Sequence, residues 1–339
     1  MPQTLHIQDF LNQGSASCII DVRTPKEFKQ GHIPGAINIP LFSNEERVII
    51  GTIYKQVGKQ EAIHKGLEVV GPKMADLVTL AKNNAVNNTV YVHCWRGGMR
   101  SGSVAWLYEL YGFKVFVLKG GYKAYRQAVL ENLQTQAPIR ILGGRTGSGK
   151  THILHKLNEK GQQIVDLERL ANHKGSAFGS IGENTQPTQE QFENELMNSL
   201  KKLNETQPVW FEDESRMIGK NMIPLTLWDQ MRKAPVIYVD VPFESRITNL
   251  IDDYGKFPAQ QLEESILKIA KRLGPEQTKL SIEALYKGDL KTVCEFCLHY
   301  YDKTYDYGLQ NRTEPNIHQF SFQEANFDTI AHTLLNINI

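Results

Sequence analysis

This chain of 339 residues has few cysteines, almost no net charge and no long hydrophobic run. Its four cysteines form no regular framework, which indicates reduced thiols and a cytoplasmic location instead of a disulfide-rich secreted fold. No stretch approaches the ~18 uninterrupted apolar residues of a membrane span, so we expect no membrane association. Residues 1–6 lack a basic segment followed by an apolar one, and we therefore expect no signal peptide.

The charge balance and the composition exclude two further classes of protein. With 38 Lys and Arg against 37 Asp and Glu, the chain is not a uniformly basic nucleic-acid binder, although it can still carry a local basic face. A hydrophobic fraction of 41% and a charged fraction of 22% are typical of globular proteins and exclude wholesale disorder. At ~100–200 residues per domain, the length predicts two domains.

Short apolar runs alternate with longer amphipathic stretches along the chain, which is the pattern of α/β architecture. In the first part of the chain this pattern predicts strands at residues 18–22, 89–93 and 114–118, and helices at residues 74–83, 101–111 and 122–133. In the second part it predicts strands at residues 139–142, 163–166, 208–211 and 235–240, a helix at residues 152–160, and a mainly helical region over residues 258–307. The polar segment 134–138 ends in proline and is the predicted linker between an N-terminal domain (1–133) and a C-terminal domain (139–339).

A cysteine stands at the junction between a predicted strand and a predicted helix, in the segment His-Cys-Trp-Arg-Gly-Gly-Met-Arg-Ser (residues 93–101). Backbone N–H groups that turn inward at the start of a helix bind anions, and the same field favours a thiolate. We therefore predict that Cys94 is a nucleophile with a lowered pKa. Arg96 and Arg100 add positive charge, and Arg100 can hold an oxyanion through two hydrogen bonds. A cysteine that merely ends a core strand would not require two arginines, two glycines and a helix start around it.

A second motif, at residues 144–151, matches G-x-x-x-x-G-K-[ST] between a predicted strand and a predicted helix. This pattern predicts a phosphate-binding loop made of Gly144, Arg145, Thr146, Gly147, Ser148, Gly149, Lys150 and Thr151. Asp213 follows a later predicted strand, and we expect Asp213 and Thr151 to be ligands of Mg²⁺, with Glu212 close to them; a solvated strand end is the alternative for these acids. The motif predicts that a di- or triphosphate binds, but it does not show that ATP is hydrolysed. The sequence has no Asn-Lys-x-Asp element, which disfavours a GTPase.

Two other features are weaker. Ten Lys and Arg residues but only two Glu lie between residues 96 and 156, which favours RNA as a partner; the alternative is that each anion site only needs local cations.

Cys294 and Cys297 form an isolated CxxC. Since zinc needs four ligands and no second pair is present, we expect these cysteines to pack in a core.

The segment 93–101 resembles the active-site loop of the rhodanese family, and residues 21–28 and 31–40 resemble that family's N-terminal signature. The resemblance implies that the loop cysteine carries sulfur or selenium. Many sulfur-transferring members have four residues between the cysteine and the closing arginine, whereas five separate Cys94 from Arg100 here. That spacing also resembles cysteine-dependent phosphatases and implies room for a phosphate-sized group.

The combination of this loop with the P-loop resembles the family of bacterial tRNA 2-selenouridine synthases, as do the segments 51–56, 118–126, 170–176 and 211–215. The resemblance implies a rhodanese-like parallel-sheet domain followed by a P-loop domain with a helical C-terminal region. It also implies exchange of sulfur for selenium at the wobble uridine (U34) in the anticodon loop of tRNAs for Lys, Glu and Gln. Geranyl diphosphate and selenophosphate would be co-substrates, with Cys94 as the selenium carrier. We expect no tightly bound cofactor; Mg²⁺ is expected from the phosphate-loop motif and not from the resemblance.

Two alternatives belong to other classes of protein. A nucleotide-regulated, cysteine-dependent phosphatase or sulfurtransferase would act without RNA. A nucleotide-dependent RNA-binding module without enzymatic activity would not need the Cys94–Arg100 spacing, and thiol alkylation would not affect it.

Overall fold

A computed structural model describes residues 2–14, 17–310, 312 and 316–337 of the chain. These residues form two compact units, each described by itself below. Unit 1 runs to Asn132 and includes Glu193–Glu195, while unit 2 comprises Leu133–Phe192 and the residues from Leu196 onward. In the described ranges, no helix combines the length and the apolar character that crossing a bilayer requires.

Unit 1 is built on a five-stranded parallel sheet with the strand order β1-β5-β4-β2-β3. Its strands are β1 (Gln3–Leu5), β2 (Cys18–Asp21), β3 (Ile37–Asn38), β4 (Thr89–His93) and β5 (Lys114–Leu118). The middle strand β4 pairs Val92 with Ile20 of β2 on one side and with Val117 of β5 on the other. Because β4 ends at His93, the chain that follows it starts at the centre of the carboxyl edge of the sheet.

The helices of unit 1 are α1 (Ile7–Gly14), α2 (Pro25–Gln30), α3 (Asn44–Gln56), α4 (Lys59–Val70), α5 (Met74–Asn84), α6 (Met99–Tyr111) and α7 (Gly121–Glu131). The hydrophobic pattern predicted α5, α6 and α7, although α6 begins two residues earlier than expected. The helical hairpin of α3 and α4 was not predicted. α3 has no fully buried side chain and α4 has only Ala62. The hairpin therefore lacks the buried apolar face by which an amphipathic helix is recognised in a sequence.

Unit 2 contains a second five-stranded parallel sheet, with the strand order β12-β11-β6-β8-β7. Its strands are β6 (Ile139–Gly143), β7 (Gln163–Val165), β8 (Val209–Glu212), β11 (Val236–Asp240) and β12 (Ile317–Ser321). A short antiparallel pair, β9 (Met217–Ile218) and β10 (Asn221–Met222), lies outside this sheet. Leu142 of β6 pairs with Glu212 of β8, so the segments after these two strands begin side by side at the carboxyl edge. Both sheets confirm the predicted α/β class.

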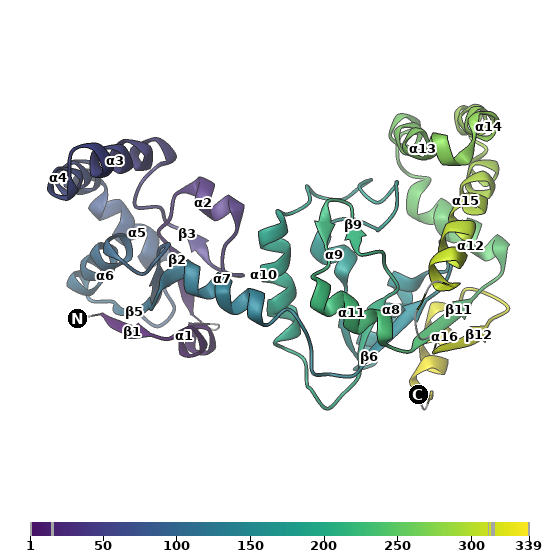
Figure 1. The fold of residues 1–339 in the computed structure, drawn as a ribbon, viewed down its shortest axis with the longest axis horizontal. Coiled ribbons are helices and arrows are strands. Elements are labelled where there is room, and N and C mark those ends of the chain that lie inside the picture. The colour runs from purple at the N-terminus through teal and green to yellow at the C-terminus, as the bar shows by residue number, and fades with distance from the viewer. Residues whose placement is uncertain (1, 15–16, 311, 313–315, 338–339) are drawn as a thin grey trace. The chain divides into compact units, whose positions relative to one another are not determined.

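The helices of unit 2 are α8 (Lys150–Glu159), α9 (Leu167–Ala171), α10 (Gln189–Leu200), α11 (Leu225–Lys233), α12 (Phe243–Tyr254), α13 (Ala259–Leu273), α14 (Pro275–Tyr286), α15 (Leu290–Gln310) and α16 (Phe327–Leu335). As predicted, the region after Pro258 is mainly helical, and α13, α14 and α15 pack together (Figure 1). A small apolar core that is separate from the core beside the sheet includes Leu262, Ile269, Val293 and Cys297. At ~1.5 Å per residue, the 21 residues of α15 span ~30 Å, which is long enough to run from this core to the edge of the sheet.

Candidate functional site

The side chain of Cys94 lies just beyond the end of β4, with only 3% of its surface exposed. Burial by itself opposes ionisation, yet the pKa of Cys94 is held below its ordinary value. The Ser101 hydroxyl, 3.2 Å from Sγ, the backbone N–H groups of Ser101 and Arg96, and the charge of Arg100 together outweigh the cost of burial. The lowered pKa agrees with the sequence and favours the thiolate, while the role of Cys94 as a nucleophile stays a prediction.

Hydrogen bonds to the start of α7 fix the direction of the peptide groups in the Cys94 loop. The N–H groups of Tyr122 and Lys123 donate to the carbonyls of Cys94 and Trp95, at 2.8 and 2.9 Å. Gly97 has a φ of +66°, and a Cβ there would lie 2.7 Å from the carbonyl oxygen of Leu118. Only glycine allows the loop to approach β5 this closely.

The guanidinium of Arg100 is held by a carboxylate that the sequence analysis did not single out. Its Nη1 and Nη2 donate to the two carboxylate oxygens of Glu27, at 2.8 and 3.2 Å. Burial opposes ionisation of Glu27, but its hydrogen bond and charge interaction with Arg100 keep its pKa below the ordinary value. Glu27 also completes a capping box with Thr24 at the start of α2. The T-x-x-E spacing was visible in the sequence, but it indicates a helix cap and not a partner 73 residues away.

Arg96 and His93 flank Cys94 in sequence but differ in their surroundings. The backbone N–H of Arg96 bonds to Cys94, while the Arg96 side chain is exposed at the surface. His93 is fully buried, and its ring nitrogens have no hydrogen-bond partner among the described residues. Burial lowers the pKa of His93, which favours the neutral ring. Of these two residues, Arg96 supplies a backbone hydrogen-bond donor to Cys94 and a positive charge at the surface.

The predicted phosphate loop connects β6 to α8, with Lys150 as the first residue of the helix. A Cβ at Gly144 would lie 2.6 Å from Ser148 Oγ and 2.8 Å from the carbonyl oxygen of Val239, so the tight curve of the loop requires glycine there. Lys150 Nζ donates to the carbonyl of Gly144 at 3.1 Å, across the mouth of the loop. The buried hydroxyl of Ser148 has no hydrogen-bond partner among the described residues. A free hydroxyl, a lysine and a helix N-terminus suit a bound phosphate.

The last turns of α15 brace this loop. Tyr305 Oη accepts a hydrogen bond from the Gly144 N–H at 2.9 Å and donates to Asp213 Oδ2 at 2.9 Å. Arg312 Nη2 bonds to Asp213 Oδ1. The structure thus places both carboxylate oxygens of Asp213 in contacts with Tyr305 and Arg312. Its predicted role as a magnesium ligand stays a prediction.

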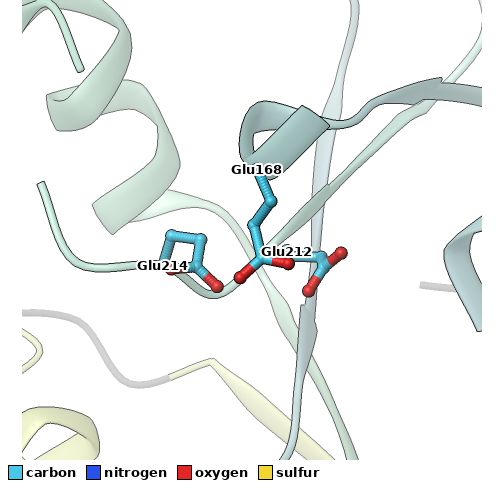
Figure 2. A group of neighbouring side chains, drawn as sticks. All are labelled: Glu168, Glu212 and Glu214. Atoms are coloured by element: carbon cyan, nitrogen blue, oxygen red, sulfur yellow. The ribbon is translucent and has the colours of Figure 1, made fainter. Parts of the chain in front are cut away.

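Three other carboxylates gather at the same edge, with one oxygen of each within 4.8 Å of the others (Figure 2). They belong to Glu168, Glu212 and Glu214. Burial and the charges of neighbouring acids raise the pKa of all three carboxyls. Thr151 Oγ1 donates to Glu168 Oε2 at 3.3 Å, and Glu212 Oε1 has no hydrogen-bond partner among the described residues. Buried like charges need protons or a cation, and three carboxylates with a threonine hydroxyl form an oxygen donor set that suits Mg²⁺.

The alternation of side chains along a β-strand could have identified two of these acids from the sequence. Successive side chains of a strand point to opposite faces, so at the end of β8 Glu212 and Glu214 share one side while Asp213 points to the other. Glu168 gave no such signal. It lies in the five-residue helix α9, after β7, and only the pairing of β7 with β8 brings it to the other two.

Comparisons with known proteins agree with this geometry. A family model described as the tRNA 2-selenouridine synthase AAA domain matches residues 137–333. A second model, described as a rhodanese-like domain, matches residues 6–128. The two matches cover the unit that holds the phosphate loop and the unit that holds Cys94.

Curated relatives extend over both units. The chain is 37% identical to the tRNA 2-selenouridine synthase of Proteus mirabilis (strain HI4320), and the match covers 91% of this chain and 93% of that protein. The protein of the same name from Shewanella woodyi (strain ATCC 51908 / MS32) is 35% identical, with 95% of each chain covered. The chain therefore belongs to the tRNA 2-selenouridine synthase family.

Proposed function

We propose that this protein is a tRNA-modifying enzyme that replaces the sulfur of 2-thiouridine with selenium at the wobble position. The observation that carries the proposal is that one chain holds both an ionisable thiol in an anion-binding loop and a phosphate cradle. Membership of the family supports tRNA as the substrate. In our proposal the substrates are the tRNAs for Lys, Glu and Gln, and the reaction has a geranylation step and a selenation step.

In the first step, geranyl diphosphate alkylates the 2-thio group of the uridine. The thiocarbonyl sulfur attacks the first carbon of the geranyl chain, the carbon–oxygen bond breaks, and diphosphate leaves with the electron pair. Loop amides, the Ser148 hydroxyl and the Lys150 ammonium stabilise the charge that develops on the diphosphate. Alkylation makes the sulfur a good leaving group for the second step.

Mg²⁺ would be held by Glu168, Glu212, Glu214 and the hydroxyl of Thr151. When bound, the ion neutralises charge on phosphate oxygens. The raised pKa values of the three carboxyls mean that the site releases protons when it binds a cation.

In the second step, Cys94 takes up selenium from selenophosphate: the S–Se bond forms, the P–Se bond breaks and phosphate leaves, and a disulfide accepts the two electrons that selenide-level selenium gives up. Arg100, held in place by Glu27, and the inward-facing amides of the loop bind the phosphate portion. The selenium then bonds to C2 of the base, the bond from C2 to the S-geranyl group breaks and geranyl thiol departs, and the S–Se bond to Cys94 breaks as two electrons return from the dithiol that the acceptor has become.

Electron balance gives this step a specific test. Selenophosphate holds selenium at the selenide level, so a selenium atom carried on Cys94 Sγ requires an acceptor, such as a disulfide, for two electrons. Attack of the same thiolate on phosphorus would instead form an S–P bond and release selenide without an acceptor. Mass spectrometry of the trapped Cys94 peptide separates the two adducts by the isotope pattern of selenium. A phosphorus adduct alone would overturn the carrier role of Cys94.

The whole proposal is tested by mass spectrometry of tRNA nucleosides after incubation with geranyl diphosphate and selenophosphate, omitting each in turn. We expect S-geranyl-2-thiouridine without selenophosphate, and 2-selenouridine only when both are present. Unchanged tRNA, together with phosphatase or sulfurtransferase activity on small substrates, would favour the alternative function.

Two variants separate the steps. Cys94→Ala should abolish selenation while geranylated tRNA accumulates, with Cys18→Ala as the control because burial raises the pKa of Cys18 to about 11. Lys150→Ala should slow geranylation by roughly a hundredfold, in line with the loss of one transition-state contact. Equal loss of both steps in either variant would contradict the division of labour.

A further inference from the structure

The phosphate loop opens into a cavity of about 1370 Å³ that extends well beyond the space a diphosphate needs. The cavity includes the first residues of α8 and the three clustered glutamates at one end. Its other walls come from α12, α13 and α15, in the helical region of unit 2. Figure 1 shows α12 and α15 side by side there, and the two helices are in contact.

The wall formed by these helices is mostly apolar. It includes Leu262, Ile269, Leu290, Val293, Cys294 and Cys297. Leu262, Ile269, Val293 and Cys297 belong to the small helical core, so one side of that core faces the cavity. The charged residues of these helices that reach the cavity are Asp253 of α12, which is half-buried and pairs with His152 at 3.6 Å, and the exposed Lys268, Lys271 and Arg272 of α13.

Two tyrosines of this wall use their hydroxyl groups within the protein. Tyr301 Oη accepts from the N–H of Ala177 at 3.2 Å, and Tyr300 Oη accepts from Arg272 Nη1 at 2.9 Å. A nucleobase is recognised through donors and acceptors that match its edges. On this wall the hydroxyl groups of Tyr300 and Tyr301 already have protein partners, while the aliphatic residues of α13 and α15 present carbon to the cavity.

The two cysteines of the CxxC motif are part of this wall. Cys294 and Cys297 lie on adjacent turns of α15, and both line the cavity. Burial raises the pKa of Cys294 to about 11 and of Cys297 to about 12. Both thiols are therefore neutral at physiological pH, and in this form cysteine behaves as a small hydrophobic residue.

One rigid element connects the apolar wall to the phosphate loop. The first turns of α15, from Leu290 to Tyr301, line the cavity. Its later turns hold the loop through Tyr305 on Gly144 and Asp306 on Arg145. A ligand with a diphosphate at one end and a hydrocarbon tail at the other would contact a single helix along its length.

We propose that the cavity wall formed by α12, α13 and α15, with the CxxC pair as part of its lining, binds the hydrocarbon tail of the diphosphate ester whose diphosphate occupies the phosphate loop. This inference rests on the proposed function, because it assigns the tail-binding site of the same substrate. Nothing in the residues that form the wall requires a metal or a redox role for Cys294 and Cys297.

The test compares ligands of increasing tail length on the full chain, with Mg²⁺ present and by calorimetry. The ligands are inorganic diphosphate, dimethylallyl diphosphate, geranyl diphosphate and ADP. Since each buried methylene contributes ~0.8 kcal/mol, we expect affinity to rise at least about tenfold from the five-carbon to the ten-carbon tail. ADP should bind no more tightly than inorganic diphosphate. An affinity that is independent of tail length, or a preference for ADP, would overturn the assignment.

A tryptophan substitution locates the tail. Cys294→Trp fills the cavity and should weaken geranyl diphosphate at least tenfold while the affinity for inorganic diphosphate stays within about twofold, which also shows that the loop is folded. Lys291→Trp places the same side chain on the exposed side of α15 and should leave both affinities unchanged. If Cys294→Trp leaves the affinity for geranyl diphosphate unchanged, the tail lies elsewhere.

Transfer to tRNA separates this inference from the proposed function. If geranyl diphosphate binds as expected but no geranyl group reaches tRNA, the tail site stands and the proposed reaction fails. If transfer occurs and Cys294→Trp does not alter its KM for geranyl diphosphate, the reaction stands and the tail site fails.

Discussion

Cysteine residues in this chain have opposite acid strengths because their surroundings differ. Cys18 and Cys297 are buried and Cys294 is half-buried, and loss of hydration is the main cause that raises the pKa values of all three. Cys94 is also buried, but it accepts hydrogen bonds and lies near a guanidinium, so its pKa is lowered. Chemical reactivity at the residue scale therefore depends on donors around the sulfur and not on exposure.

Removing one donor should make Cys94 an ordinary thiol. Ser101→Ala deletes the hydroxyl 3.2 Å from Sγ, and a hydrogen bond to a charged group contributes ~1.5–3 kcal/mol. We expect alkylation of Cys94 by iodoacetamide at pH 7 to slow roughly tenfold, with the rate recovering as the pH is raised. Ser103→Ala, in an exposed position on the same helix, is the control. An unchanged rate profile would show that the Ser101 hydroxyl does not stabilise the thiolate.

At the scale of elements, the site of unit 2 depends on contacts between segments far apart in sequence. The phosphate loop follows β6. Glu212 and Glu214 lie at and just after the end of β8, and Glu168 lies in the short helix α9. α15 then closes the arrangement, because Tyr305 bonds to Gly144, 161 residues away, and to Asp213, 92 residues away. Each contact fixes a polar group that would otherwise be unsatisfied at a partly buried edge.

The Tyr305 hydroxyl should therefore stabilise unit 2. Tyr305→Phe leaves the Gly144 N–H and one oxygen of Asp213 without a partner, which costs ~1–3 kcal/mol for a buried group. We expect a lower thermal midpoint and weaker binding of inorganic diphosphate. Tyr307→Phe, on the exposed side of the same helix, should have little effect. Equal midpoints for the two variants would show that the Tyr305 bridge is not stabilising.

The clustered acids predict a pH dependence with a definite sign. Glu168, Glu212 and Glu214 have higher pKa values folded than unfolded, so the folded chain binds more protons once the pH exceeds ~4.3. Their contribution to the free energy of unfolding is then lost as the pH rises through the folded pKa values. Mg²⁺ should restore stability, and its effect on the thermal midpoint should be larger at pH 8 than at pH 5.5 because the ligands must be deprotonated.

Matched substitutions check this explanation. Glu212→Gln should reduce the loss of stability with pH, whereas Glu205→Gln, at an exposed loop position, should not. A magnesium effect that is the same at both pH values would argue against cation binding by the three carboxylates.

At the scale of the whole molecule, the two sites obey one rule. Each follows a central strand of a parallel sheet and lies at the carboxyl edge, where helix N-termini provide N–H donors. Two predicted anion sites in one chain agree with the proposed reaction, which has two phosphorylated co-substrates. The partner that we propose, tRNA, is a polyanion, so its binding should depend strongly on salt concentration.

Binding of tRNA should weaken strongly as salt rises, because cations condensed on the phosphates are released when Lys and Arg side chains contact them. We expect the affinity for bulk tRNA in a filter assay to fall at least roughly tenfold between 50 and 200 mM salt. Cys94→Ala should bind tRNA as well as the unaltered protein does. Affinity that does not depend on salt would oppose direct contacts to the tRNA backbone.

Much of this protein was predictable from its amino-acid sequence, because the signals are local. Buried strands such as β4 and β11 appear as short apolar runs, and the phosphate loop and the Cys94 loop are contiguous motifs between a strand and a helix. The expectation that the isolated CxxC packs in a core is confirmed for Cys297, while Cys294 is only half-buried and lies outside that core. The edge strand β12 was missed because its side chains are only half-buried and give a weak pattern.

What only the tertiary structure decided is which distant residues meet. No local pattern indicates that Glu27 holds Arg100, that Glu168 joins Glu212 and Glu214, or that α15 lines a cavity beside the phosphate loop. Strand order and helix packing set these contacts, and both depend on the burial of many side chains at once. The sequence therefore determined the chemistry of each motif, while folding determined the partners that set its charge, its proton affinity and its neighbouring space.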